Sequence, residues 1–483
     1  MPHLIVIGAG IGGLTSAALL LKQGWRVTVL EASTYPGGCA GTFFHKGYRF
    51  DAGATLAGGF DPTGPHTRLA EILGLTWNTT PIRDAAWVVH LPEKTIHQWV
   101  DPLRWRAEYL ENFPYSESFW LIQERLARIS WDVSTRDFPF PPATLKEALR
   151  LPLALRLDTL SGAPYLTRKL RGLLPRQTEA DFKAFVDAQL LISAQAISDD
   201  ANALYGSTVL DLPRRGVVQV NGGMGGIAET LVKWIRANGG EVLYRQQVTR
   251  LESKNGRISA ALTNKDLRVE ADIFLGNLTP WALEKLLGEA APTRLRAEVN
   301  RRDPMWGAFA LYVGLNAEII PQPITHHQVV MDVNQPLGEG NSVFISLSPL
   351  DDFSRAPKGL RTATLSTHTR VLDWDKLPPE TYEKRKAEYT ELLLNAAERA
   401  LPGFRNAAQL VMAGTPHTFE SFTRRPLGMV GGFPQTSLLG ARTPHTGVKN
   451  LWLVGDSIFP GQSTAGVTIG SMRVARLLQD YAR

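Results

Sequence analysis

Residues 4–31 of the chain read LIVIGAGIGGLTSAALLLKQGWRVTVLE. Residues 4–7 are a short apolar run, which is typical of a buried parallel strand. Residues 15–23 favour a helix that Gly24 ends, and residues 26–30 are a second strand-like run. The stretch therefore predicts a strand, a helix and a second strand, in the order of a βαβ unit.

The turn between the first strand and the helix carries the pattern G-x-G-x-x-G at Gly8, Gly10 and Gly13, with Gly12 beside the last. Gly8 allows a tight turn, Gly10 lets the backbone approach a pyrophosphate, and Gly13 lets the helix pack closely on the strand. The start of the helix offers amides and a positive dipole end to phosphates. Glu31 follows the second strand, where an acid accepts hydrogen bonds from ribose hydroxyls. Together these features predict a dinucleotide-binding unit.

The next stretch indicates which dinucleotide is bound. Residues 35–55 read YPGGCAGTFFHKGYRFDAGAT and carry two more glycine segments. This arrangement resembles the FAD-binding start of the amine oxidase and carotenoid desaturase superfamily. The resemblance implies that Gly38 and Cys39 lie beside the pyrophosphate, and Ala54 and Thr55 beside the isoalloxazine ring. Many relatives have an arginine directly after the glycine pair that corresponds to Gly37 and Gly38. Because Cys39 occupies that position here, the negative charge of the phosphates has to be balanced by backbone amides, by the helix dipole or by a basic residue elsewhere.

Composition bounds the remaining classes. A chain of 483 residues predicts two domains, and 44% hydrophobic with 20% charged residues is ordinary for a globular protein. One cysteine excludes an internal disulfide and agrees with a reducing compartment, and we interpret Cys39 as a small packing residue. The N-terminus lacks the basic start of a signal peptide, and no apolar run is long enough to predict a membrane span.

A net charge of +6 indicates an anionic partner or surface. Nucleic acid is disfavoured, because the basic residues form no run with interleaved aromatics. The segment 145–177 carries seven basic residues interleaved with leucines, against two acidic ones. Such a segment lies in a lipid headgroup region or forms a helical cap with a solvated basic face. With the family resemblance, we expect membrane contact.

Residues 221–231, NGGMGGIAETL, formally contain a second fingerprint at Gly223, Gly225 and Ala228. The acid that should follow, Glu241, begins the next predicted strand instead of ending it. It therefore stands at the wrong end of the sheet to reach a ribose, and we predict no second nucleotide site.

In the same superfamily a GGM segment begins a helix, which leads to a strand with the motif V-x-x-L or V-x-x-I. Here that motif is residues 248–251, and the resemblance implies that the Val248 backbone meets the adenine. Residues 258–262 and 267–271 predict a hairpin. Residues 273–277 predict the strand that closes this part of the chain, with Asn277 at the cofactor.

Several strand-like runs between residues 280 and 422 predict an antiparallel sheet, with one long helix over 381–401. His326 and His327 belong to one of these strands, and we expect no metal site there. Residues 450–467, NLWLVGDSIFPGQSTAGV, predict a strand that ends at Gly455 and Asp456 and then a last helix. Asp456 suits a ribityl or phosphate-proximal hydroxyl. The amides near Gly466 and Val467 suit the flavin pyrimidine, where negative charge develops on reduction.

These elements predict an α/β protein: a Rossmann-like FAD-binding domain of the glutathione reductase and amine oxidase type, interleaved with an α+β substrate domain. The substrate domain is expected to carry an antiparallel sheet and a helical, membrane-facing cap. We assign residues 1–84, 215–282 and 425–483 to the FAD domain, and 85–214 and 283–424 to the substrate domain.

The quoted segments, with residues 415–432, resemble the carotenoid (phytoene) desaturase and isomerase family of FAD-dependent oxidoreductases. The sequence of residues 52–60 and 454–467 is most similar to that of bacterial C-3',4' desaturases. The resemblance implies transfer of hydride from an acyclic or 1-hydroxylated carotene to flavin N5, with His417 and Glu420 as candidate proton acceptors. The alternatives are a phytoene-type desaturase, a flavin-dependent carotene cis-trans isomerase and, more distantly, a soluble amine oxidase.

The same resemblance implies quinone or oxygen as the electron acceptor, since no second nucleotide fold is predicted. It also implies a cytoplasmic enzyme attached peripherally to membrane lipid through residues 145–177.

Overall fold

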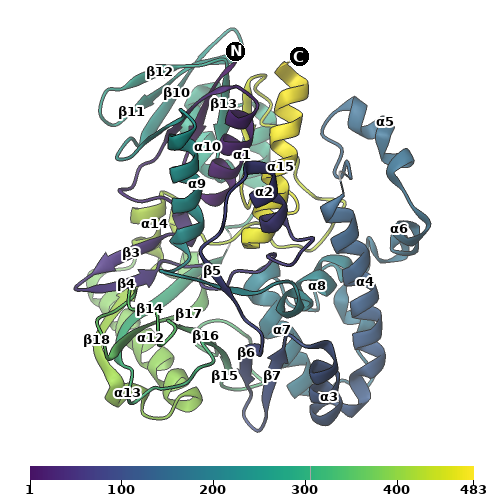
Figure 1. Ribbon diagram of the computed structural model, residues 1–483, viewed down its shortest axis with the longest axis vertical. Helices are drawn as coiled ribbons and strands as arrows, with labels where there is room; N and C mark the ends of the chain where they lie inside the picture. The colour runs from purple at the N-terminus through teal and green to yellow at the C-terminus, as the bar shows by residue number, and fades with distance from the viewer. Residues whose placement is uncertain (137, 305, 483) are drawn as a thin grey trace.

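A five-stranded parallel sheet joins the two ends of the chain. The computed structural model describes residues 1–136, 138–304 and 306–482. The sheet has the strand order β19-β13-β1-β2-β9. Its strands are β1 (His3–Ile7), β2 (Arg26–Leu30), β9 (Glu241–Leu243), β13 (Ile273–Gly276) and β19 (Leu451–Leu453). Strands from the beginning, middle and end of the sequence therefore lie side by side (Figure 1).

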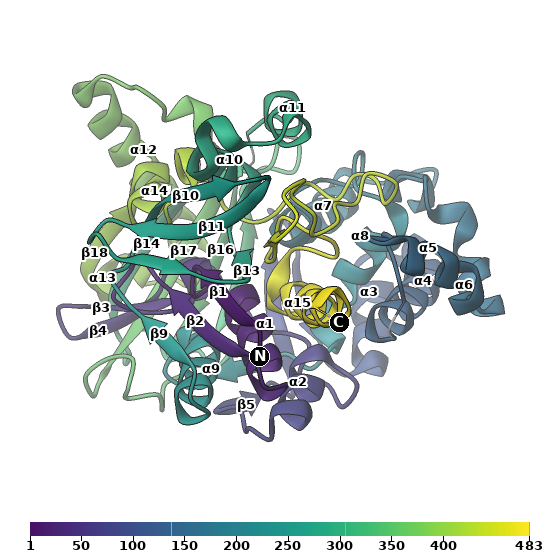
Figure 2. The same cartoon turned by 90° about the horizontal axis from the view of Figure 1, so that it is seen from above.

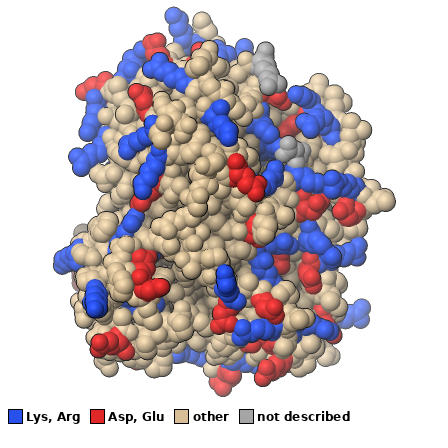
Figure 3. Space-filling model, viewed as in Figure 1, with Lys and Arg blue, Asp and Glu red and all other residues tan. Residues whose placement is uncertain are grey.

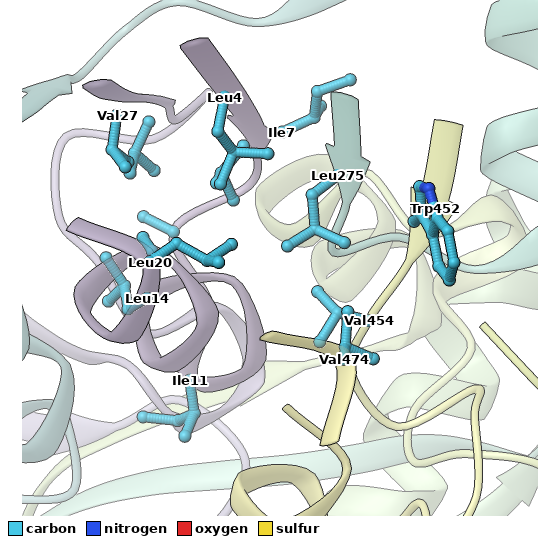
Figure 4. Packing of buried hydrophobic residues seen from close by; sticks show 14 of the residues in the cluster. Leu4, Ile7, Ile11, Leu14, Leu20, Val27, Leu275, Trp452, Val454 and Val474 are labelled. Carbon is cyan, nitrogen blue, oxygen red and sulfur yellow. The ribbon is translucent and has the colours of Figure 1, made fainter. Parts of the chain in front are cut away.

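Helix α1 (Ile11–Lys22) packs on this sheet and begins inside the glycine pattern. The predicted start at residue 15 is wrong, because the Leu14 amide already donates to the Gly10 carbonyl at 3.0 Å, so the first turn encloses Gly12 and Gly13. Figure 4 shows side chains of the sheet, such as Leu4, packed against those of the helix, such as Leu20. The βαβ unit itself is confirmed.

Layers cover both faces of the parallel sheet (Figure 2). One face is covered by the helices α1, α2 (Pro65–Leu73), α9 (Gly225–Ala237) and α15 (Ser463–Ala482). The other is covered by the antiparallel strands β10 (Val248–Lys254), β11 (Arg257–Thr263) and β12 (Arg268–Glu270), next to which lie α10 (Pro280–Leu287) and α11 (Thr293–Arg301). The predicted hairpin is thus confirmed as β11 and β12.

A second sheet of seven strands has the order β18-β14-β17-β16-β15-β6-β7. Its strands are β6 (Ala85–His90), β7 (Thr95–Trp99), β14 (Trp306–Asn316), β15 (His326–Val330), β16 (Ser342–Leu347), β17 (Leu360–Arg370) and β18 (Ala408–Gly414). Neighbouring strands are antiparallel except β6 and β15, which run parallel. The expected antiparallel sheet is confirmed, and the early β6–β7 hairpin extends it.

The two faces of this sheet differ in side-chain size. On one face Phe309, Leu311 and Ile345 pack against α12 (Pro379–Ala400), which is the predicted long helix. Below α12 lies α13 (Phe404–Ala407). On the opposite face the alternating positions of the same strands carry Ala308 and Ser366. Because successive side chains of a strand point to opposite faces, this alternation leaves open space on one side only.

Helices from the middle of the chain flank the second sheet. They are α3 (Pro102–Asn112), α4 (Glu117–Thr135), α7 (Ala180–Ala194) and α8 (Ala203–Leu210), with α14 (Pro416–Thr423) nearer the first sheet. Short strand pairs β3 (Thr42–His45) with β4 (Tyr48–Asp51), and β5 (Thr79–Pro81) with β8 (Val218–Val220), connect the layers.

Helices α5 (Leu145–Ala154) and α6 (Leu157–Ser161) stand out from the body beside α4 (Figure 1). Neither helix contributes a buried residue. Among the described residues, no helix is both long and apolar enough to cross a membrane.

Candidate functional site

One cavity of about 1670 Å³ lies between the carboxyl ends of the parallel strands and the small-residue face of the seven-stranded sheet. It is larger than the roughly 300–1,000 Å³ of a typical single-ligand pocket. All residues expected at the cofactor line it except Gly13 and Gly466. The cavity therefore has room for a dinucleotide together with a second molecule.

The side chain of Asn277, directly after β13, explains why several neighbouring positions are glycines. It fills the space beside the glycine loop: a Cβ on Gly10 would overlap Asn277 Nδ2, and one on Gly455 would lie 2.5 Å from Asn277 Oδ1. A Cβ on Gly12 would lie 2.9 Å from the Gly455 Cα atom. These glycines allow three segments to meet where the start of α1 opens into the cavity, and such a cradle fits a pyrophosphate.

Gly13 and Gly466 have packing roles instead. A Cβ on Gly13 would lie 2.5 Å from the Gly8 carbonyl oxygen, so Gly13 brings α1 onto β1 as expected. In the first turn of α15, the Gly466 amide donates to Ser463 Oγ at 3.1 Å, and a Cβ there would lie 2.5 Å from the Gly461 carbonyl oxygen. Val467, the next residue, lines the cavity.

Glu31 is buried at the end of β2, where it holds the glycine loop. Its carboxylate accepts hydrogen bonds of 2.7 Å from the amides of Ala9 and Ser33. Burial raises the pKa of Glu31, while these amide donors act in the opposite direction. At the far end of the same part of the cavity lies Val248, the first residue of β10.

A buried arginine lies at the centre of the cofactor side. Arg425 Nη2 donates to both carboxylate oxygens of Asp456 at 2.6 Å, and Nη1 lies 3.9 Å from Cys39 Sγ. Burial disfavours the guanidinium charge, but the interactions with Asp456 and Cys39 together raise the pKa of Arg425. Burial also raises the pKa of the Cys39 thiol, so Cys39 is neutral here and its interpretation as a packing residue agrees with the geometry.

The segment around Ala54 and Thr55 is tied to the seven-stranded sheet. His326 Nε2 bonds the Thr55 carbonyl at 2.9 Å, and Ser346 Oγ donates to Thr55 Oγ1 at 2.7 Å. Tyr312 donates to the Ala52 carbonyl at 2.6 Å. Burial lowers the pKa of His326 to about 4, so its ring is neutral at pH 7. The sheet thus fixes this segment against the cavity.

The rest of the cavity is lined by small side chains of the second sheet together with larger ones such as Phe344, and it contains the polar pair Gln195–His368. The lining there includes Ala308, Ala310, Ser342, Thr364 and Ser366. Gln195 Nε2 lies 3.2 Å from His368 Nε2, and Gln195 Oε1 is buried with no hydrogen-bond partner among the described residues.

The segment that resembled a second fingerprint is occupied by the protein itself. The amide of Met224 donates to Asp51 Oδ1 at 2.8 Å, and that of Gly225 to Thr42 Oγ1 at 2.7 Å. Because these amides at the start of α9 already have acceptors, they are not available to a phosphate. Glu241 opens β9, as predicted.

The candidate proton acceptors are exposed at the rim of the cavity. His417 stacks on Tyr382 with a ring separation of 5.2 Å, and Glu420 lies one turn further along α14. His326 and His327 lie on β15, as predicted. Across the described ranges, no group of three or more His, Cys, Asp or Glu side chains could hold a metal ion.

Sequence reasoning did not identify Arg425, Tyr312, Gln195 or His368. No local pattern marks them, since Arg425 reaches Cys39 across 386 positions of the chain and Gln195 reaches His368 across 173. The only available indication for Arg425 was the missing arginine after the glycine pair.

Comparison with known proteins agrees with this architecture. Residues 6–73 match the family model of the NAD(P)-binding Rossmann-like domain. The chloroplastic prolycopene isomerase of Arabidopsis thaliana is 28% identical, over 98% of this chain and 81% of its own. The zeta-carotene-forming phytoene desaturase of Myxococcus xanthus is 25% identical, over 99% and 94%. A solved structure of putrescine oxidase matches with a TM-score of 0.64 at 18% identity, over 100% of this chain and 99% of its own.

Fold and site therefore define a Rossmann-fold oxidoreductase of the amine oxidase type. Within that class, the chain is similar over nearly its whole length to carotenoid isomerases and desaturases.

Proposed function

We propose that the protein is an FAD-dependent carotenoid desaturase that introduces the C-3',4' double bond into an acyclic or 1-hydroxylated carotene. The observation that carries the proposal is one large cavity, in which glycines suited to a dinucleotide share a space with a sheet face where small side chains leave room for an extended apolar chain.

FAD fits the residues present. The glycine cradle around Asn277 would hold the pyrophosphate, Glu31 the adenosine ribose and the Val248 backbone the adenine. Asp456 would face a ribityl hydroxyl, and residues 54–55 with the first turn of α15 would flank the ring. When bound, the flavin supplies the hydride acceptor for the reaction.

Desaturation breaks two C–H bonds on adjacent carbons and forms one C=C bond; one hydrogen leaves as hydride and the other as a proton. The polyene stabilises charge at the allylic carbon, so the protein mainly has to position the chain and exclude water. His417 and Glu420 remain candidate proton acceptors, at the rim where water is also available. The similarity of residues 52–60 and 454–467 to bacterial C-3',4' desaturases supports desaturation of the C-3',4' bond rather than of the bonds that phytoene-type enzymes desaturate.

The electron acceptor we propose is a membrane quinone or oxygen. The occupied amides at the start of α9 argue against a second nucleotide in that segment. We further propose a cytoplasmic enzyme held at a membrane surface by α5 and α6, where a carotene resides. Their exposed leucines support this: Leu149, Leu153 and Leu157 are 69%, 86% and 88% exposed.

The proposal is tested in bacteria that accumulate lycopene or a 1-hydroxylated lycopene derivative. Expression of the chain should shift the pigment absorption to the red and lower the product mass by two hydrogens. A changed isomer composition at constant mass would instead establish a cis-trans isomerase. Unchanged pigments in cells shown to contain FAD-loaded protein would contradict both, and oxidation of a primary amine by the purified protein would favour an amine oxidase.

A further inference from the structure

Arg425 is built into the cofactor side of the cavity by more than its ion pair. Besides Asp456, it donates from Nη1 to the Gly431 carbonyl at 3.0 Å. Its side chain is 13% exposed, whereas that of a solvated surface arginine is largely exposed. The guanidinium is therefore fixed between Gly455–Asp456 and the segment 35–55, which contains the glycine pair Gly37–Gly38.

Cys39 makes room for this arrangement. It occupies the position after Gly38, and its Sγ atom lies 3.9 Å from Arg425 Nη1. An arginine at position 39 would bring a second guanidinium to the place that Arg425 already fills. The small, neutral residue at 39 thus leaves space for the guanidinium of Arg425.

We infer that Arg425 supplies, from the opposite end of the chain, the cation that relatives place directly after the glycine pair, and that it holds Asp456 while balancing the cofactor pyrophosphate. The inference rests on the proposed binding of FAD, and Arg425 acts as a positioning residue. Pyrophosphate and Asp456 are both anionic, and without the arginine they would face each other in a partly buried site.

The test is the dissociation constant of FAD, measured by fluorescence with purified apoprotein, with thermal unfolding of each apoprotein as a check on folding. Arg425→Gln should weaken FAD binding by about tenfold to a hundredfold (roughly 1.4–2.8 kcal/mol), since the unpaired Asp456 carboxylate would then face the anionic pyrophosphate. Arg424→Gln, which removes the same charge from the exposed neighbour, should change it less than threefold (roughly 0.6 kcal/mol).

The decisive variant is Cys39→Arg combined with Arg425→Ala. It should bind FAD at least about tenfold more tightly than Arg425→Ala alone, because the cation returns to the same place from position 39. Cys39→Arg in the presence of Arg425 should weaken binding, because two cations then compete for one position.

Tight binding by Arg425→Gln, or no recovery in the folded double variant, would overturn the inference while leaving the proposed function intact. A wild-type protein that binds no FAD would overturn both.

Discussion

At the scale of single residues, buried histidines link the fold to pH. His66 in α2 is fully buried, stacks on Phe60 with a ring separation of 4.3 Å, and has no hydrogen-bond partner on either ring nitrogen among the described residues. Burial lowers its pKa to about 3. The ring is therefore neutral in the folded protein at any pH where the protein is expected to work.

We predict that His66→Phe reduces the acid sensitivity of the protein. The unfolded chain binds a proton at His66 below about pH 6.5, whereas the folded protein does so only near pH 3, so stability decreases as the pH falls below 6.5. Between pH 6.5 and pH 5 this site should cost about 2 kcal/mol of unfolding free energy, and a phenylalanine removes that cost. Urea unfolding of the wild type and of His66→Phe at pH 7 and pH 5 measures this loss of unfolding free energy. An equal loss of stability in wild type and variant would contradict the prediction.

At the scale of elements, α5 and α6 form an unusual surface. Leu145, Leu149 and Leu153 recur every four residues on α5 and are 69–86% exposed. Figure 3 shows Lys and Arg atoms, with Asp and Glu atoms among them, along the right edge of the molecule, where Figure 1 draws these helices. An apolar stripe flanked by cations suits an anionic lipid surface, because the leucines enter the headgroup boundary while the cations stay in water.

We predict that replacing Leu149, Leu153 and Leu157 together by serine weakens binding to phosphatidylglycerol vesicles by at least about tenfold, as expected when several inserted side chains are lost. Thermal stability should be unchanged, because all three side chains are exposed. Vesicle sedimentation measures the binding. Leu103→Ser on α3, where the leucine is 78% exposed, is the matched control. Equal binding by the triple variant and the control would show that this surface does not contact lipid.

At the scale of the whole molecule, the cavity exists because two sheets with different roles face each other. The parallel sheet brings the glycine segments to its carboxyl edge, as in other α/β folds. The seven-stranded sheet turns Phe309, Leu311 and Ile345 toward α12, whereas its cavity face combines small side chains such as Ala308 and Ser366 with larger ones such as Tyr312 and Phe344. We therefore expect that positions on the cavity face of this sheet other than those bonded to residues 52–55 can be changed without altering the cofactor part of the cavity.

Accordingly, Ser366→Leu should reduce carotene conversion by about tenfold or more while leaving the FAD content of the purified protein unchanged, because the larger side chain fills the substrate floor. Ser366→Ala keeps the space and should retain conversion within about threefold. Pigment analysis in cells and the flavin absorbance of the protein are the two measurements. Loss of FAD in Ser366→Leu would mean that the two parts of the cavity are not separate.

Much of the fold could be predicted because its signals are local. The βαβ unit, the β11–β12 hairpin and α12 depend on periodicity and on turn residues within short windows, and their boundaries differ by only a few residues from the structure. Most of the residues expected at the cofactor line the cavity, and many of them could be proposed from the sequence because they lie in or beside glycine turns; Val248 was proposed from the family resemblance alone. Their contact with a cofactor stays a prediction. The division into two interleaved domains stays a prediction.

The sequence by itself determined that a parallel strand, a glycine turn and a helix form a dinucleotide cradle, because steric limits on backbone conformation leave those glycines few alternatives. Only the tertiary structure decided that Arg425 lies beside Cys39, that Gln195 meets His368, and that the amides of α9 are occupied. Such contacts join segments hundreds of residues apart. They arise from the way the layers pack together, which no local pattern of residues encodes.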